Sequence, residues 1–430
     1  MIELNLGVLV LLLFLLLVFL RAPVFVALAA PSIVYFQLTG FSPSYISQQM
    51  INVVDSFTLL AIPLYIFLGG LMNHGRIADR IFDFAYDVIG HVTNGLAQVN
   101  IATSLVFSGM SGSALADIGG IGRILIHEMK DRGYSGEYSA ALTGTSATVG
   151  PIFPPSIPLI IYGLLAQVSV LSLFLAGILP ALLTVLLLAV GSFLLAYRKD
   201  FPKREGRPAL DRILKSGYRA LPALIAPVLL VGGMLAGYFS AIEAAVVTIA
   251  YMIAINTLFY RMFEISYIWK SATESVRLSA TIIVILAAAG LFARVVTLEG
   301  IDEMFASFLF GISGNTLVIL LIVNLFLLIL GLFLEPVAAL VMATPIVVPP
   351  LVELGLDPTH IGIIIVFNLM LGLLTPPLGL SLFMASDISD TKVSAIITEL
   401  KPYYVILVLA LLLITFVPAV SLTIPDAVLG

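Results

Sequence analysis

The segment from Val149 to Ser156 constrains the fold of this chain more than any other. It reads VGPIFPPS and lies in a long apolar region, yet its three prolines exclude a continuous helix, because each removes a backbone donor and disfavours helix at the preceding residue. In a bilayer, backbone that leaves the helix must be buried in protein or line a wet cavity. The segment therefore predicts a discontinuous transmembrane helix with an ion or a substrate at its break.

The second half of the chain repeats this feature when 222 is added to each residue number. The proline pair 154–155 then falls on 376–377, Gly150 falls on Gly372, and Ser146 falls on Asn368, with no gap. Paired interruptions of this kind indicate the binding site of a transporter. We expect Ser146 and Asn368 to stabilise their broken helices.

The composition places the chain in a membrane. Of its 430 residues, 60% are hydrophobic and 10% are charged, and its mean hydropathy is +1.15. That is enough apolar sequence for about ten spanning helices of about 20 residues each. The chain has no cysteine, and its four histidines lack metal-ligand spacing. We therefore expect no cofactor other than a coupling ion, and no enzymatic activity.

The expected fold is an all-α polytopic membrane protein of two inverted repeats, each with a re-entrant hairpin and a discontinuous helix. The first repeat covers 1–197, with its hairpin at 93–131 and its broken helix at 136–165. A cytoplasmic linker, 198–219, leads to the second repeat, 220–430, with its hairpin at 316–352 and its broken helix at 359–388.

The hairpins and broken helices, about 93–165 and 316–388, are expected to move together as one elevator-type body. The remaining segments are expected to form a frame around them. The frame helices are expected at 5–20, 23–39, 56–73, 169–197, 220–236, 239–260, 278–296 and 402–421. Residues 40–55 are expected to be a polar outer loop. The amphipathic segments 75–90 and 262–277 are expected to be interfacial arms joining body and frame.

The positive charges predict the orientation. Each half has five expected crossings, an odd number, so the second half is inverted relative to the first. A cytoplasmic linker puts nearly all Lys and Arg inside, with Arg294 outside and Arg123 within a hairpin arm, as the positive-inside rule requires. The segment 1–20 lacks a basic start and is followed by Arg21, which favours a retained helix with a periplasmic N-terminus.

Two clusters of small and polar residues are candidate sodium sites, because sodium prefers oxygen ligands and unwound helices expose carbonyls. The first comprises Ser111, Gly112 and Ser113 at the hairpin tip, facing Thr148, Gly150 and Pro151 at the break. The second comprises Phe333 and Glu335 at the tip, facing Gly372 and Thr375. The alternative is that these residues only relieve crowding where helices approach closely.

Two acids are expected at membrane depth, where a charge is expensive and marks function by default. Asp117 lies one helical turn beyond Ser113, so it can face the same cavity; a structural cap or ion pair fits it equally well. Glu335 can be an ion ligand, a gate residue or a helix cap. The Gly-Met-Ser-Gly run ending at Gly112 is also typical of intramembrane serine proteases, but no histidine is expected at the depth that a base requires.

Several of these motifs together resemble the large membrane subunit (the DctM-like M subunit) of tripartite ATP-independent periplasmic (TRAP) transporters. The resemblance rests on 108–113 with Asp117, on Pro154-Pro155-Ser156-Ile157-Pro158, on Gly355-Leu356-Asp357-Pro358, on Asn368 and on Thr375-Pro376-Pro377-Leu378-Gly379. It covers essentially the whole chain. It implies sodium-coupled uptake of an organic anion by an elevator mechanism in the bacterial inner membrane.

The resemblance also implies substrate residues and partners. The family's substrate-side serine and acid map to Ser113 and Asp117, and we expect Pro154, Pro155 and Ser156 at the break to contact the substrate as well, because a helix N-terminus suits a carboxylate. The implied partners are a small four-helix membrane subunit, a periplasmic binding protein and membrane lipid, and no nucleic acid. The substrate class includes sialic acid and C4-dicarboxylates.

Two other functions remain open at this stage. One is a sodium-coupled dicarboxylate or anion transporter of related architecture that uses no binding protein, which a neighbouring gene for such a protein would exclude. The other is a channel, which saturable, sodium-dependent uptake would exclude.

The orientation is tested by cysteine labelling, for which the cysteine-free chain has no background. We expect Ser42→Cys to react with a membrane-impermeant thiol reagent from the periplasmic side. Ser216→Cys should react only after the membrane is opened. The opposite pattern would reverse the assignment of both repeats.

Overall fold

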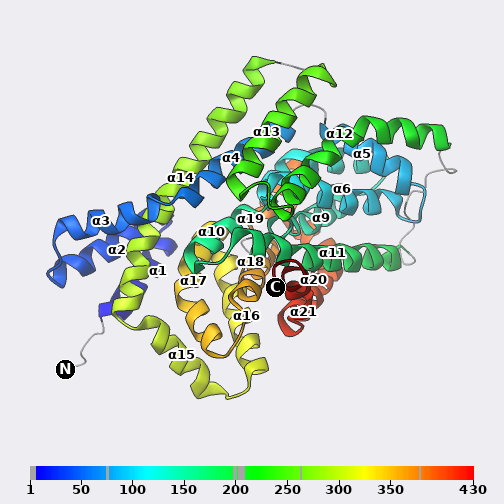
Figure 1. Cartoon of the computed structure of the whole chain (residues 1–430). Helices are drawn as coiled ribbons and strands as arrows, with labels where there is room; N and C mark the ends of the chain where they lie inside the picture. Colours follow the sequence, from blue (N-terminus) through cyan, green and yellow to red (C-terminus); the bar gives the residue numbers. More distant parts are fainter. Residues whose placement is uncertain (1–5, 74–76, 197–200, 202–208, 262–263, 377–378) are drawn as a thin grey trace.

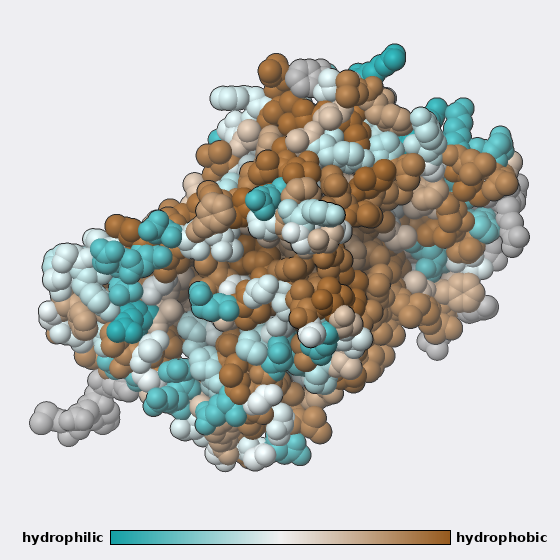
Figure 2. Space-filling model, in the orientation of Figure 1, coloured by the Kyte–Doolittle hydropathy of each residue, from teal (hydrophilic) through white to brown (hydrophobic). Residues whose placement is uncertain are grey.

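The computed structural model describes residues 6–73, 77–196, 201, 209–261, 264–376 and 379–430 (Figure 1). This part of the chain is helical throughout and contains no strand. Eight of its helices are long and apolar enough to cross a membrane, or nine if one bent pair counts as a single span. Apolar side chains cover much of the surface seen in Figure 2, as expected of a protein that faces lipid.

One group of helices forms a frame around the long helix α14, which packs along α2, α3 and α4. In Figure 1 it crosses the blue helices of the N-terminal region. Helix α13 packs on α4 and α12, and α1 packs on α2. The frame comprises α1 (Leu6–Phe19), α2 (Val24–Leu38), α3 (Pro43–Val54), η1 (Phe57–Leu60), α4 (Ala61–Asn73), α12 (Leu210–Leu235), α13 (Ala241–Leu258) and α14 (Ile265–Leu298).

A second group, here called the body, contains both hairpins and both broken helices. Its first half comprises α6 (Gly95–Ser111), α7 (Ala114–Asp117), η2 (Ile118–Gly122), α8 (Arg123–Asp131), α9 (Gly136–Ala147), η3 (Gly150–Ile152), α10 (Ile157–Ala166) and α11 (Val170–Leu195). Its second half comprises α16 (Thr316–Phe333), α17 (Pro336–Glu353), α18 (Pro358–Leu374), α19 (Leu380–Ser389), α20 (Val393–Phe416) and α21 (Ala419–Leu429).

The two halves of the body interlock. The far half of each broken helix packs on the other half's hairpin: α10 lies against α17, and α19 lies against η2 and α8. The two breaks are thereby held in one packed unit. Helices α11 and α20 pack on α6, α9 and α18, so the helix expected at 169–197 joins the body instead of the frame.

Two amphipathic helices connect the frame to the body: α5 (Ile77–Ile89) precedes α6, and α15 (Ile301–Ile312) precedes α16. The face of α5 that contains Ile77, Ile81 and Phe82 is buried. The Arg212 guanidinium of α12 forms an ion pair of 3.1 Å with Asp87 of α5. Helix α15 packs on α17.

Several sequence-based boundaries were wrong. The expected loop 40–55 contains helix α3, which begins with Ser42 as its N-cap and Pro43 in its first turn, a favourable start. Residues 210–219 of the expected linker are the start of α12. The expected arm 262–277 is, from Ile265 on, the first part of the 34-residue helix α14. The expected helix 402–421 runs from Val393 to Phe416, and α21 follows Pro418.

The second arm, α15, was missed altogether. Its position agrees with the repeat, since adding 222 to the bounds of α5 yields 299–311, close to the observed 301–312. The sequence signal was weak because α15 has a mostly apolar composition, with both acids in its first turn. A strict application of the offset to residues 77–89 would have found it.

Glu299 fixes the end of α14 to the N-terminal helices of the frame. Its carboxylate accepts hydrogen bonds from the Tyr35 hydroxyl at 2.6 Å and from the Gly7 backbone N–H at 3.1 Å. Glu299→Ala leaves both donors without this acceptor and should lower stability by about 1–3 kcal/mol. Thermal unfolding in detergent measures this, with Glu303→Ala, an exposed acid four residues along, as the control. Equal melting temperatures for the two variants would contradict this role.

Candidate functional site

The first hairpin tip touches the first helix break through backbone. Gly112 ends α6 in the left-handed conformation, with φ 61°. A β-carbon placed on Gly112 would lie 2.6 Å from the carbonyl oxygen of Pro155 and 3.1 Å from the backbone nitrogen of Ile157. Only glycine meets both the φ requirement and the space available here. The expected apposition of this tip and this break is therefore present.

Asp117 lies deep within this contact. Its side chain is buried, with 1% relative exposure, and one of its carboxylate oxygens accepts a hydrogen bond of 3.0 Å from the Ser108 hydroxyl. A β-carbon on Gly150 would lie 2.6 Å from the same carboxylate oxygen. The carboxylate is thus in close contact with the backbone of Gly150 at the break. Ser108 is a site residue that the analysis of the sequence did not select.

The π-helical turn η2 follows Asp117 directly and contains Gly119, Gly120 and Gly122. Such turns are rare and frequently occur at functional sites, since they redirect the helix and loosen its hydrogen bonding. A β-carbon on Gly122 would lie 2.9 Å from the Thr143 side chain and 3.0 Å from the Asp117 carbonyl. The glycines therefore let this arm pack tightly on α9.

Two serines, Ser113 at the first tip and Ser156 at the first break, cap helices. Ser113 accepts a hydrogen bond from the Ala116 N–H and is the N-cap of α7. Ser156 accepts one of 3.2 Å from the Leu159 N–H, is the N-cap of α10, and donates to the carbonyl of Pro151. The Thr148 hydroxyl donates to the Thr145 carbonyl at 2.7 Å. The side chain of Ser111 lies outside the described part of the chain.

The remaining residues of the break line the same contact. Pro151 lies in the 3-10 turn η3 and is buried. The carbonyl of Pro154 would lie 3.5 Å from a β-carbon on Gly109 of α6. The described residues of the first sodium cluster and of the expected substrate set therefore lie in one small region between α6, α7, η3 and α10.

The second tip and break approach through two glycines. A β-carbon on Gly372 of α18 would lie 2.5 Å from the carbonyl carbon of Gly331 on α16. Glu335 is the N-cap of α17, and its carboxylate accepts hydrogen bonds of 3.1 Å from the Val337 N–H and 3.3 Å from the Ala338 N–H. Of its three expected roles, the structure therefore shows the helix cap.

Thr375 lies where α18 ends. Its hydroxyl is 2.8 Å from the Leu371 carbonyl and 2.7 Å from the Tyr404 hydroxyl of α20. Phe333, unlike the other residues of the second sodium cluster, directs its side chain toward the frame. Its ring packs against Phe19 of α1 with centroids 5.8 Å apart. Only the backbone of Phe333 remains available to an ion at the break. The expected proline 377 lies outside the described residues.

Buried amides hold each broken helix to its hairpin. Ser146 donates a hydrogen bond of 2.9 Å to the Asn100 side chain of α6, which in turn donates one of 2.7 Å to Thr143. In the second half, Asn368 donates one of 2.6 Å to the Asn324 side chain of α16. The prediction that Ser146 and Asn368 stabilise these helices agrees with these contacts.

Both sites are built from oxygen atoms. Among the described residues, no group of three or more His, Asp or Glu is placed to bind a metal ion. The imidazole of His360 lies 2.6 Å from the Ser421 hydroxyl, and that of His127 lies 2.7 Å from the Arg123 carbonyl of its own helix. Hydroxyls, carbonyls and single carboxylates suit a monovalent cation better than a transition metal.

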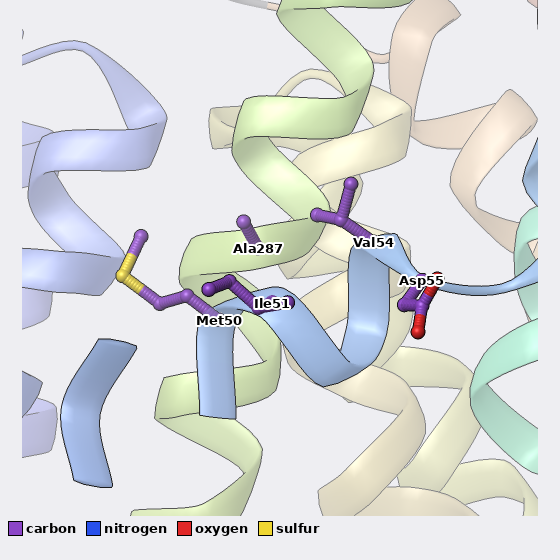
Figure 3. Close-up of a pocket in the computed structure, with 5 residues that line it drawn as sticks. All are labelled: Met50, Ile51, Val54, Asp55 and Ala287. Carbon is purple, nitrogen blue, oxygen red and sulfur yellow. The ribbon is translucent and has the colours of Figure 1, made fainter. Parts of the chain in front are cut away.

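A separate open pocket of about 470 Å³ lies in the frame, between α3 and α14. It is lined by Met50, Ile51, Val54, Asp55 and Ala287 (Figure 3). None of these residues belongs to the body, so the pocket does not coincide with either hairpin tip.

Comparison with known proteins identifies the chain's relatives. A family model described as "Tripartite ATP-independent periplasmic transporter, DctM component" matches residues 11–420. The sialic acid TRAP transporter large permease protein SiaM of Vibrio cholerae is 38% identical over 410 residues, which are 95% of this chain and 94% of that protein. The C4-dicarboxylate TRAP transporter large permease protein DctM of Pseudomonas aeruginosa is 37% identical, over 90% of this chain and 91% of that protein.

Two further proteins extend the comparison. The sialic acid TRAP transporter permease protein SiaT of Haemophilus influenzae is 33% identical over 97% of this chain but only 68% of its own length. The crystal structure of the Alcanivorax borkumensis YdaH transporter, reported to have an unusual topology, aligns with a TM-score of 0.58. That alignment covers 86% of this chain and 87% of the other at 15% sequence identity, so it concerns the fold alone.

The Gly331–Gly372 contact yields a packing prediction. Gly372→Ala should force α18 away from α16 and lower stability by about 1–3 kcal/mol, as overpacking does. Gly232→Ala on α12 is the matched control, since nothing lies within 4 Å of its added methyl group and alanine favours helix. Melting temperatures in detergent compare them. A tolerated Gly372→Ala would show that the two helices separate at no cost.

Proposed function

The chain belongs to the family of the DctM component of tripartite ATP-independent periplasmic transporters, and on that premise we propose that it carries an organic anion across the inner membrane by sodium-coupled elevator transport. Members of this family are transporters and not enzymes, and the apolar helices make this chain a multi-pass membrane protein. The observation that carries the proposal is the pair of oxygen-lined contacts between hairpin tip and helix break.

The proposed substrate is a carboxylate such as sialic acid or a C4-dicarboxylate, the substrates in the names of SiaM and DctM. A periplasmic binding protein would deliver it, and a small four-helix membrane subunit would complete the permease. SiaT supports the small membrane subunit as a partner. This chain matches 68% of SiaT, and the remaining third of SiaT would hold such a subunit.

We place one sodium ion at each tip–break contact. At the first, the proposed ligands come from Ser111, Gly112, Ser113, Thr148, Gly150 and Pro151; at the second, from the backbone of Phe333 and from Glu335, Gly372 and Thr375. Backbone carbonyls at the ends of α9 and α18 would provide oxygen atoms in addition to the side chains. The caps support this assignment, because the side-chain oxygens of Ser113 and Glu335 lie at the first turns of α7 and α17.

For the substrate we propose Ser113, Pro154, Pro155 and Ser156, where α10 begins. A helix N-terminus with a serine cap attracts a carboxylate. Asp117 is better placed beside the sodium ion than beside the substrate, because a buried carboxylate repels an anion unless a cation lies between them. Its contact with the backbone of Gly150 supports this position.

The two halves form inverted repeats in this proposal, with the N-terminus in the periplasm. The moving unit is the body, including α11, α20 and α21, since these helices pack mainly on the hairpins and broken helices. Helix α11 also contacts the frame, through α12 and through the ring of Phe174 on Tyr65 of α4. Helices α5 and α15 connect the moving unit to the frame. When the body moves as a whole, an ion keeps its contacts with both the hairpin tip and the helix break. If one hairpin moved alone, the ion would lose half of its ligands in a low-dielectric environment, which is costly.

Sodium coupling is tested at Thr375, the residue that ends α18 at the second break. Thr375→Ala should raise the sodium concentration for half-maximal uptake about tenfold, the value of one good ligand or hydrogen bond. Thr375→Ser keeps the hydroxyl and should stay near the wild type. Tyr404→Phe removes the partner of Thr375 but not the proposed ligand, so it reports on packing alone. An unchanged sodium curve for Thr375→Ala at normal expression would remove Thr375 from the site.

Elevator motion is tested by two crosslinks in the cysteine-free chain. Phe19→Cys with Phe333→Cys joins the frame to the body, where the rings pack 5.8 Å apart. Ser172→Cys with Thr359→Cys joins α11 to α18 within the body, where the hydroxyls lie 3.4 Å apart. We expect the first crosslink to abolish uptake but leave substrate binding, and the second to leave uptake intact. Uptake through a verified 19–333 crosslink would exclude the elevator.

A further inference from the structure

The cytoplasmic ends of α12 and α13, in the proposed orientation, are joined by a set of tyrosine contacts. The Tyr260 hydroxyl donates a hydrogen bond of 3.0 Å to the Arg219 carbonyl, and the Tyr251 hydroxyl donates one of 3.0 Å to the Pro222 carbonyl. The rings of Tyr218 and Phe259 pack with centroids 5.5 Å apart. These contacts bring residues 29 to 41 positions apart in the sequence onto one surface.

That surface is apolar where the candidate span Ala241–Leu258 ends. Leu258 is 77% exposed, Tyr218 is 65% exposed and Leu214 is 64% exposed. Aromatic rings that have an apolar body and a polar edge concentrate where a membrane meets water. Leu258, which precedes Phe259 at the end of α13, then lies on the acyl-chain side of this boundary.

Three cations lie within three residues of the aromatic pair in the sequence: Lys215 and Arg219 on α12, and Arg261 just after α13. All three are exposed. Within the described part of the chain, none of their side chains takes part in an ion pair or a hydrogen bond. Neighbouring arginines behave differently, since Arg212 pairs with Asp87 and the Arg80 guanidinium lies 3.5 Å from the centre of the Tyr260 ring.

We propose that this basic–aromatic patch, made of Leu214, Lys215, Tyr218, Arg219, Phe259 and Arg261, binds the phosphate headgroup of an anionic phospholipid in the inner leaflet. The unpaired cations complement the headgroup charge. The rings of Tyr218 and Phe259 lie at the boundary between the headgroup and the acyl chains. Basic pockets between transmembrane helices on the cytoplasmic side have the chemistry for such headgroups.

The consequence concerns the connecting helix α5. Tyr260 contacts both the backbone of Arg219 and the guanidinium of Arg80 on α5. A lipid on the patch therefore lies next to the anchorage of α5 on the frame. The inference rests on the proposed orientation but not on transport, so it is tested by binding alone.

The experiment measures lipid binding to the full-length chain in nanodiscs of phosphatidylcholine, with and without about 20 mol% phosphatidylglycerol. Each cation near the surface is expected to attract an anionic lipid by about 1 kcal/mol, which this lipid fraction makes detectable. Lys215→Gln with Arg219→Gln should weaken retention of phosphatidylglycerol, measured by native mass spectrometry, by about tenfold or more. The rise in melting temperature caused by phosphatidylglycerol should be lost as well. Lys215→Arg with Arg219→Lys, which keeps both charges, should behave as the wild type.

The matched control is Lys392→Gln with Lys401→Gln, which removes the same charge from exposed positions at α20. Selective loss in the 215/219 variant supports the patch. Equal loss in both neutralised variants means diffuse surface charge and overturns the proposal. So does equal retention of phosphatidylcholine and phosphatidylglycerol by the wild type. Release of the lipid when the small membrane subunit binds would assign the patch to a protein interface and would also overturn it.

Discussion

Close backbone contact at two helix breaks is the constraint on which the rest of the structure depends. Gly112 meets the carbonyl of Pro155, and Gly331 meets Gly372, in a protein whose surroundings supply no water to unpaired backbone groups. A break in a transmembrane helix is tolerated only when other protein covers it. The hairpin tips provide that cover. Because the contacts are made by glycine and proline backbone, the tips and breaks approach each other closely enough to exclude side chains.

The packing of the body follows from this requirement. Each broken helix is covered by its own hairpin and supported by the opposite one, with α10 on α17 and α19 on η2 and α8. Buried amides, Asn100 and Asn324, attach the first arms to the broken helices. The proposed ion sites therefore lie within one packed unit. In the proposed elevator motion this unit moves along its boundary with the frame, where Phe19 packs on Phe333. The connecting helices α5 and α15 bridge that boundary.

Much of the site was predictable because its residues have unusual backbone properties. Prolines that exclude helix, and glycines at tips, leave a signal in the sequence that apolar packing does not. The structure ends α6 at Gly112, begins α17 after Glu335, and interrupts the apolar helices at η3 and after Thr375. Side-chain directions were not predictable in the same way. Phe333 turned out to face α1, and Ser108 was overlooked, because a partner from another helix decides where each side chain lies. Helix α15 and the amphipathic start of α12 were missed or misplaced for lack of a strong break or charge signal.

The sequence by itself determined the membrane class, the family and the positions of both interruptions, since hydropathy, proline and glycine act locally on the backbone. It also determined that the two halves correspond at an offset of 222 residues. Only the tertiary structure decided which helices belong to the body. Helix α11 reads as an ordinary apolar span, and nothing in its composition distinguishes a neighbour in the frame from one in the body. The same holds for the contact of Asp117 with Gly150, because a distance between segments 33 residues apart is set by the packing of α6, α7 and η3 and not by either segment alone.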